Sequence, residues 1–164
     1  MLSMKVFYSN ATETVLENDI NAQIEKWSAK YELAENVVRA VIATESSYQP
    51  WALRYEPHLK KTTWYTNAVP DEQKSNDYAY FSMGLMQVLY GVAVDLGFKG
   101  TPFELMDPTN SIQYGCKHLA NLKRRWPDIT DYISAYNQGS PRKTEEGLYQ
   151  NQAYVEKVMA QFSD

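Results

Sequence analysis

Glu45 occupies a position that suits acid–base chemistry. Val38, Val41 and Ile42 precede it by seven, four and three residues, so all four side chains share one face of a helix. Pro50 stops that helix soon afterwards, which places the carboxyl near the negative end of the helix dipole. Apolar neighbours and the dipole both disfavour the carboxylate anion, so both raise the pKa of this side chain. Glu45 is therefore a candidate general acid.

Two interpretations of Glu45 remain open from the helix alone. Acids with perturbed pKa values gather at functional sites, which favours a catalytic role. The apolar stripe could equally end at the surface with a solvated Glu45, because glutamate is rarely fully buried without a partner. The choice depends on which other residues the fold brings to this carboxyl.

Two later segments, Gly84-Leu85-Met86-Gln87 and Ala135-Tyr136-Asn137, carry groups that a binding site can use. A glycine lets the backbone approach a ligand, and a glutamine amide offers a hydrogen-bond donor and an acceptor. Each residue also has a structural interpretation. Gly84 can simply start a helix, Gln87 can be an exposed amide, and Tyr136 can be a core side chain. Alone, none of them decides the function.

In order and spacing, these segments together with Glu45-Ser46 resemble the signature of lytic transglycosylases with the soluble-transglycosylase catalytic domain, relatives in fold of goose-type lysozymes. The resemblance covers about residues 37–158. It implies a mainly α, lysozyme-like helical domain with a small β element. We predict a single catalytic domain over residues 1–164. The interval from Glu45 to Gly84 is longer than is usual in the family, so we also predict an irregular insert at about residues 50–80.

The resemblance assigns a role to each matching residue. Glu45 corresponds to the single catalytic acid/base, and Tyr136 to a tyrosine whose hydroxyl orients the catalytic carboxyl. Gly84 and Gln87 correspond to the cleft wall opposite the acid, and Met86 to a side chain that packs against bound sugar. The other substrate-binding residues that it implies are Ser46, Ser82, Asn137 and Tyr154, and Tyr154 corresponds to a late tyrosine often found close to the acid.

The implied substrate is the β-1,4 bond between N-acetylmuramic acid and N-acetylglucosamine in peptidoglycan. In the family, a neutral glutamic acid protonates the bridging oxygen. The resulting carboxylate then takes the proton of the muramoyl C6 hydroxyl, which closes onto the anomeric carbon to give a 1,6-anhydro product. The substrate's own acetamido group stabilises the intermediate, so neither a second carboxylate nor a cofactor is expected.

Two other functions remain open. A hydrolase of the goose-lysozyme kind would need a second acid to hold water, since glycosidases use carboxyl pairs about 5 to 9.5 Å apart. Glu56 and Asp77, both in the insert, are available for that role. An inactive glycan-binding module on the same fold would keep aromatic contacts without needing Glu45. The presence of Glu45 together with Tyr136 favours an enzyme.

Hydrophobic periodicity and capping signals predict the helices that position these residues. An extended start is followed by helices at 12–29, 34–47 and 84–96, a short helix opened by a capping box at 101–104, a long helix at 108–126, one capped by Asp128, and a closing helix at about 154–162. Within the insert, residues 53–56 and 78–81 are predicted to pair as short strands. Residues 61–76 show no period, which is typical of a functional or disordered loop.

Charge and cysteine content exclude several classes of function. The net charge is −4, which argues against a nucleic-acid binder held by phosphate neutralisation. Cys116 is the single cysteine, so no internal disulfide can form, and its apolar helical face predicts a core position. His58 and His118 have no cysteine or carboxylate at ligand spacing, so we expect no metal site.

Residues 1–20 contain no basic segment followed by an apolar run, and no stretch approaches the length of a membrane span. We therefore expect a protein made in the cytoplasm, without a signal peptide or membrane span. It would act as a monomer on peptidoglycan glycan strands after release or delivery. A phage lysin, a virion-borne entry enzyme or a domain cut from a larger protein fits this expectation, and the compact chain with its own starting methionine favours a phage or mobile-element product.

Overall fold

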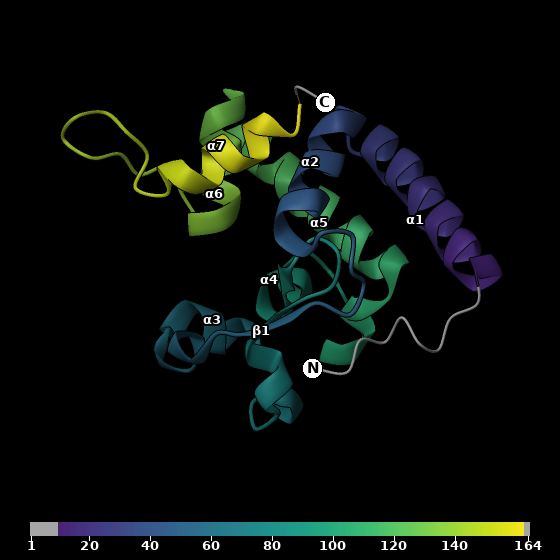
Figure 1. Cartoon of the computed structure of the whole chain (residues 1–164). Helices are drawn as coiled ribbons and strands as arrows, with labels where there is room; N and C mark the ends of the chain where they lie inside the picture. Colours follow the sequence, from purple (N-terminus) through teal and green to yellow (C-terminus); the bar gives the residue numbers. More distant parts are fainter. Residues whose placement is uncertain (1–9, 163–164) are drawn as a thin grey trace.

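Helices form most of the structure, and a small three-stranded sheet lies beside them (Figure 1). The computed structural model describes residues 10–162. The predicted extended start falls mainly in residues 1–9, which lie outside the described residues. The predicted fold class, mainly α with a small β element, is confirmed.

Helix α5 (Pro108–Arg125) runs through the middle of the molecule and contributes a fully buried face to the core (Figure 1). Ile112, Cys116 and Leu119 recur at helical spacing and have no exposed surface. The side chain of Asp107 accepts hydrogen bonds from backbone N–H groups in the first turn, which satisfies donors that would otherwise lack partners. The start signal predicted from the sequence is therefore confirmed.

Helices α1 (Asn10–Lys30) and α2 (Glu35–Ser46) pack against each other, and α1 also packs along α5. Both correspond to predicted helices. The apolar stripe that precedes Glu45 on α2 is fully buried. The helix ends where Ser47 adopts a left-handed conformation, with φ at 51°. The last turn of α2 therefore carries Glu45 out of the core.

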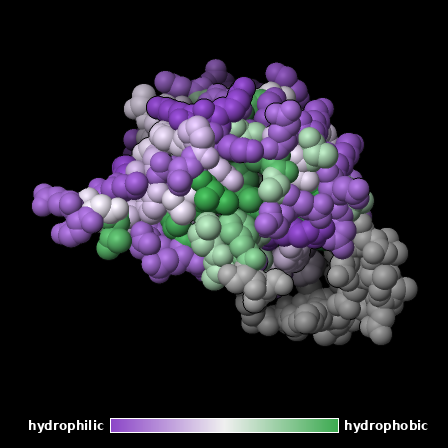
Figure 2. Space-filling view, turned by 90° about the horizontal axis from the view of Figure 1, so that it is seen from above, coloured by the Kyte–Doolittle hydropathy of each residue, from purple (hydrophilic) through white to green (hydrophobic). Residues whose placement is uncertain are grey.

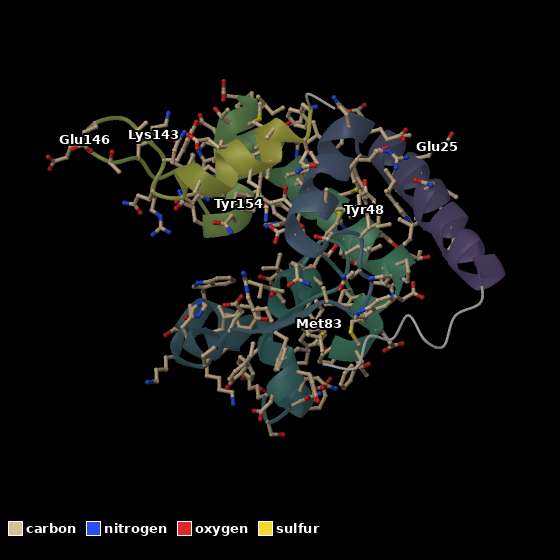
Figure 3. All side chains as sticks on the ribbon, viewed as in Figure 1. Glu25, Tyr48, Met83, Lys143, Glu146 and Tyr154 are labelled. Carbon is tan, nitrogen blue, oxygen red and sulfur yellow. The ribbon has the colours of Figure 1, made fainter. Side chains whose placement is uncertain are left out.

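Helices α6 (Ile129–Gln138) and α7 (Gln152–Ala160) pack together, and α7 also contacts α2. Between them, residues 139–151 form a loop that projects from the body of the molecule (Figure 1). Lys143 and Glu146 lie on this loop, well away from the helix face that carries Tyr154 (Figure 3).

The sheet is antiparallel and has the order β1-β2-β3, formed by Leu53–Tyr55, Phe81–Met83 and Val88–Leu89. Arg54 pairs with Ser82 in the register between β1 and β2. Alternation along β1 therefore places Arg54 on the opposite face from its two neighbours in the strand.

Residues 50–80 contain more regular structure than the sequence predicted. The first predicted strand is confirmed as β1, but the second is displaced, because residues 77–80 form a short 3₁₀ turn and β2 begins only at Phe81. Tyr65 has no exposed surface, and its hydroxyl donates to the Ala79 carbonyl and accepts from the Gly91 N–H. The helical elements of the segment are η2 (Pro57–Lys61), α3 (Thr63–Ala68), η3 (Asp71–Gln73) and η4 (Asp77–Tyr80).

The helix predicted at 84–96 is wrong in its first half. Gly84 and Gln87 have φ values of 77° and 49°, which no α-helix contains, and residues 84–87 form a turn between β2 and β3. The helix, α4 (Tyr90–Asp95), begins only after β3. Leu85, Met86 and Val88 are buried although they lie in a turn and a strand. Their spacing therefore resembled the apolar face of a helix.

The predicted starts of the two remaining helices are confirmed. The capping box forms between Thr101 and Glu104 at the start of a 3₁₀ helix, η5 (Pro102–Met106). Asp128 accepts from the first N–H groups of α6, as predicted.

The surface seen from above is hydrophilic around its edge, with hydrophobic side chains gathered near the centre (Figure 2). No helix within residues 10–162 combines the length and hydrophobicity that crossing a bilayer requires.

Candidate active site

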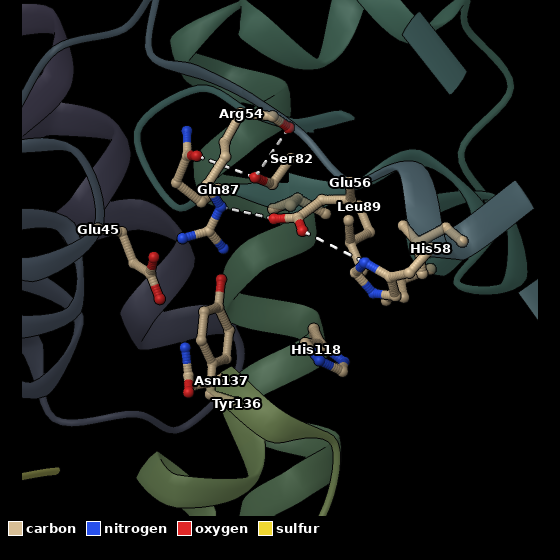
Figure 4. A pocket seen from close by; sticks show the side chains of 13 residues that line it. Glu45, Arg54, Glu56, His58, Ser82, Gln87, Leu89, His118, Tyr136 and Asn137 are labelled. Atoms are coloured by element: carbon tan, nitrogen blue, oxygen red, sulfur yellow. Dashed lines mark hydrogen bonds and ion pairs between the residues drawn. The ribbon is translucent and has the colours of Figure 1, made fainter. Parts of the chain in front are cut away.

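A cleft of about 150 Å³ opens between the sheet and helix α6, with α2, α4 and α5 completing its wall (Figure 4). The predicted site residues that it brings together are Glu45, Ser82, Gln87, Tyr136 and Asn137. These residues come from α2, from the sheet and its turn, and from α6. The three segments singled out in the sequence therefore converge on one cavity.

Glu45 reaches the cleft from the last turn of α2, and its Oε1 accepts a hydrogen bond of 2.6 Å from the hydroxyl of Tyr154. Burial raises the pKa of Glu45 and outweighs the Tyr154 hydrogen bond, which lowers it. The positive charges of Arg54 and Lys157 also lower this pKa, whereas the negative charge of Glu56 raises it. The predicted rise in pKa is confirmed in direction, with desolvation as its main cause.

The tyrosine that holds the acid is Tyr154, and the predicted hydrogen bond from Tyr136 to Glu45 is wrong. The Tyr136 hydroxyl donates instead to the carbonyl oxygen of Met86, at 2.7 Å. Burial raises the pKa of Tyr136 well above its usual value, and the negative charge of Glu45 adds to the rise. Tyr136 therefore lies near the acid and lines the cleft, but its hydroxyl ties α6 to the turn at 84–87.

Gly84, predicted to form the cleft wall, and Met86, predicted to pack against bound sugar, do not line the cleft. Met86 has no exposed surface, and its side chain lies so close to Gly115 of α5 that any Cβ there would collide with it. A Cβ on Gly84 would meet the Ser111 Oγ at 2.8 Å, and its φ of 77° disfavours other residues. Both residues are needed for close packing against α5, which explains their place in the motif without a sugar contact.

Gln87 lines the cleft, but its amide is used inside the protein. The Nε2 group donates to the carbonyl oxygens of Ala52 and Gly84, at 3.0 and 2.9 Å. The Oε1 atom accepts from the buried Ser82 hydroxyl at 3.0 Å. Both amide donors are therefore occupied, so the predicted use of Gln87 as a hydrogen-bond donor to a ligand is not supported. Gln87 and Ser82 join the turn to the sheet.

Ser46 is also structural in this arrangement. Its buried hydroxyl lies 2.8 Å from the Leu85 carbonyl oxygen and 3.1 Å from that of Ile42. Ser46 thus links the end of α2 to the turn at 84–87 and does not line the cleft.

Asn137 is exposed on the cleft rim and is oriented by Asn151, the residue that precedes α7. Its Oδ1 accepts from the Asn151 Nδ2 at 2.9 Å, and the same Asn151 amide bonds to Ser134. The Nδ2 group of Asn137 has no hydrogen-bond partner within residues 10–162. This group is free to donate to a ligand, so substrate binding by Asn137 stays a prediction.

Arg54 and Glu56 line the cleft; Arg54 was not predicted as a site residue, and Glu56 was considered only as the second acid of a hydrolase. The Arg54 Nε lies 2.5 Å from the Glu56 Oε1, and the Glu56 Oε2 lies 3.7 Å from the His58 Nδ1 (Figure 4). The available signal was the strand period, which places residues two apart on the same face. Of the two acids considered for a hydrolase, only Glu56 reaches the cleft, because Asp77 pairs with Lys60 and leaves 70% of its side chain exposed.

His118 of α5 also lines the cleft, next to the ring of Tyr136. Burial lowers the pKa of His118 to about 4, so the imidazole is neutral at pH 7. Cys116, two residues earlier on α5, is buried as predicted, and burial raises its pKa to about 12. Within the described part of the chain, no cluster of three or more histidine, cysteine, aspartate or glutamate side chains is arranged to hold a metal ion.

The cleft therefore presents one desolvated carboxyl, held by a phenol, opposite a strand that carries an arginine. A carboxyl with a raised pKa can donate a proton near neutral pH, which is the requirement for a general acid.

Comparison with known proteins gives an independent result. No curated protein and no solved structure matches the chain. The family described as the Transglycosylase SLT domain matches residues 22–158, which span most of the chain and every element of the cleft. The chain belongs to the family of transglycosylase SLT domains.

Proposed function

We propose that the protein is a peptidoglycan lytic transglycosylase that cleaves the β-1,4 bond between N-acetylmuramic acid and N-acetylglucosamine and releases a 1,6-anhydromuramoyl product. Membership of the family supports lytic transglycosylase activity on peptidoglycan in general. The observation that carries the proposal is the desolvated Glu45 carboxyl, hydrogen-bonded to Tyr154 inside a cleft.

In the first step, neutral Glu45 protonates the bridging oxygen while the bond to the anomeric carbon breaks. Tyr154 donates its own proton to Oε1, which leaves Oε2 as the oxygen that carries the transferable proton. The phenol thus fixes both the direction of the carboxyl and the atom that acts. The substrate's acetamido group stabilises the positive character that develops at the anomeric carbon.

In the second step, the Glu45 carboxylate takes the proton of the muramoyl C6 hydroxyl, and that oxygen bonds to the anomeric carbon. The acid is then neutral again and no water has been consumed. The Tyr154 hydrogen bond and the charges of Arg54 and Lys157 favour the anion that exists between the two steps. Burial and these groups act in opposite directions, so the carboxyl can give up a proton and regain it.

A muramidase that uses water is the second candidate, because Glu56 places another carboxylate in the cleft. The two reactions give different products from the same glycan. Mass spectrometry of digested peptidoglycan should show muropeptides lighter by one water than lysozyme products. Reducing-end muropeptides as the main species would assign hydrolysis instead.

The Glu45→Gln variant tests the role of the acid. Gln keeps the size of the side chain but carries no transferable proton, so the rate of wall lysis should fall by a factor of about 10² to 10⁴ while glycan binding persists. Thermal unfolding should show a folded variant, since an amide is less costly to bury than a carboxylate.

The matched control is Glu35→Gln, in the first turn of the same helix, where the carboxylate forms an exposed ion pair with Arg39. This control should lyse walls at the normal rate. Unchanged lysis in Glu45→Gln would remove the acid/base role. Absence of lysis in the unaltered protein, with glycan binding retained, would identify a binding module.

A further inference from the structure

Arg54 occupies a defined position on the sheet side of the cleft. It is the central residue of β1, and its register against Ser82 in β2 fixes the backbone from which the side chain extends. Glu56 accepts a hydrogen bond of 2.5 Å from the Nε group. The guanidinium is thus attached to a paired strand at one end and oriented by a carboxylate at its Nε.

The outer edge of this guanidinium is unoccupied. Neither terminal nitrogen of Arg54 has a hydrogen-bond partner in the described part of the chain, and 64% of the side chain is exposed. Figure 4 shows these nitrogens pointing into the pocket, on the side where Glu45 and Tyr136 lie. Two parallel N–H donors on one planar edge match the two oxygens of a carboxylate.

The charges around the cleft favour a role for this cation. Arg54 is the only arginine or lysine among the described residues that line the cavity, and His118 there is neutral at pH 7. The chain as a whole carries a net charge of −4, so its field opposes the approach of an anionic polymer. Arg54 shares the cavity with the Glu56 carboxylate, which pairs with its Nε, and its two terminal nitrogens are left to meet an anionic group of the ligand.

We propose that Arg54 binds a carboxylate of the glycan substrate beside the scissile bond, so that the cleft selects carboxylate-bearing muramoyl units over neutral acetamido sugars. This inference rests on the function proposed above and names a specificity residue for it. Two sources supply the same chemistry in peptidoglycan. One is the lactyl carboxylate of a muramoyl residue without a peptide, and the other is a free carboxylate of the peptide stem.

A structural role for Arg54 would give a different result. If the arginine only shaped the strand or only acted on the charge of Glu45, its loss would change the affinity for neutral and anionic glycans equally. The test therefore compares ligands that differ in the carboxylate alone.

The experiment measures dissociation constants by titration calorimetry at low salt, in the Glu45→Gln background so that the glycan stays intact. The proteins are Glu45→Gln, the same variant with Arg54→Gln, and the same variant with Arg125→Gln as the matched control. Arg125 stacks on Trp126 outside the cleft. The ligands are three tetrasaccharides of alternating N-acetylglucosamine and N-acetylmuramic acid, with free lactyl carboxylates, with lactyl methylamides, or with peptide stems.

Arg54→Gln should weaken binding of a carboxylate-bearing ligand about tenfold and change binding of the methylamide less than about twofold. Loss confined to the first ligand identifies the lactyl carboxylate, and loss confined to the third identifies the stem. Arg125→Gln should leave all three affinities unchanged. Equal loss for all ligands, or no loss for any, would overturn the inference while the lysis and product assays still test the proposed function. A parent variant that binds none of the ligands would overturn both.

Discussion

The two walls of the cleft differ in how they hold their charged groups. On the helical wall, Glu45 and Tyr154 form a short hydrogen bond from which water is largely excluded, and burial raises the pKa of the acid. On the sheet wall, Arg54 and Glu56 form an ion pair whose arginine is mostly in solvent. The helical wall favours the protonated acid through desolvation. The sheet wall presents a positive charge that water only partly screens.

The turn at 84–87 joins these walls, and Gln87 is the residue of the turn that lines the cleft. Its residues bond to the sheet through Gln87, to α2 through Ser46 and to α6 through Tyr136. Met86 packs beneath the turn against α5. The motif at 84–87 therefore has a structural role, because it connects the sheet wall of the cleft to the helical wall.

The largest effect is expected when the packing of the 84–87 turn against α5 is disturbed. Met86→Ala should lower the free energy of unfolding by about 2–5 kcal/mol, because a fully buried side chain leaves a cavity in the core. Chemical denaturation measures this change. At a temperature where the variant is folded, KM for glycan should stay normal. A raised KM with normal stability would show that Met86 contacts sugar after all.

The next effect concerns the helical wall. Tyr154→Phe removes a hydrogen bond to the Glu45 carboxyl, and kcat should fall about 10- to 100-fold if Glu45 acts as proposed. The Tyr154 hydrogen bond lowers the pKa of Glu45, so its loss raises that pKa further. The proton-donating form then persists to higher pH, and the alkaline limb of the kcat profile should move to higher pH.

Tyr136→Phe is the matched control for this variant. Its hydroxyl bonds to a backbone carbonyl and not to the acid, so the alkaline limb should stay in place while stability decreases. A shift of the limb in Tyr136→Phe but not in Tyr154→Phe would reverse the assignment of the two tyrosines.

A smaller effect is expected on the sheet wall. Arg54 lowers the pKa of Glu45 by its charge, so Arg54→Gln should move the alkaline limb of kcat upward, by less than Tyr154→Phe does. Added salt should shrink the difference between Arg54→Gln and the unaltered enzyme. A downward shift would contradict the direction of this coupling.

The smallest effect is expected outside the cleft. Asp77→Asn breaks an exposed ion pair with Lys60 and should leave lysis rate and products unchanged. Loss of activity in Asp77→Asn, with normal activity in Glu56→Gln, would show that the second carboxylate had been assigned to the wrong residue.

Local signals in the sequence predicted much of the fold. The caps at Asp107 and Asp128 act within their own first turns, and the stripe before Glu45 follows from helical spacing alone. The position of Glu45 at the end of a buried helix face could therefore be predicted without knowledge of its hydrogen-bond partners. The rise in its pKa followed from the same pattern.

Contacts between residues far apart in the sequence could not be predicted from local patterns. The partner of Glu45 is 109 residues away on α7, and two tyrosines were available for the role. The turn at 84–87 depends on a left-handed Gln87, a conformation that its residue type does not announce. The Arg54 side chain joined the cleft only because β1 pairs with a strand that begins at Phe81.

The central claim is that the fold raises the pKa of Glu45 by removing its carboxyl from water. Carbon-13 NMR titration of the glutamate side-chain carboxyls, with Glu45→Gln to assign the signal, measures this property directly. We predict that the Glu45 carboxyl titrates above the usual glutamate value of about 4.3 and moves further upward in Tyr154→Phe. A Glu45 carboxyl that titrates at or below the usual value, and is unaffected by Tyr154→Phe, would contradict the claim.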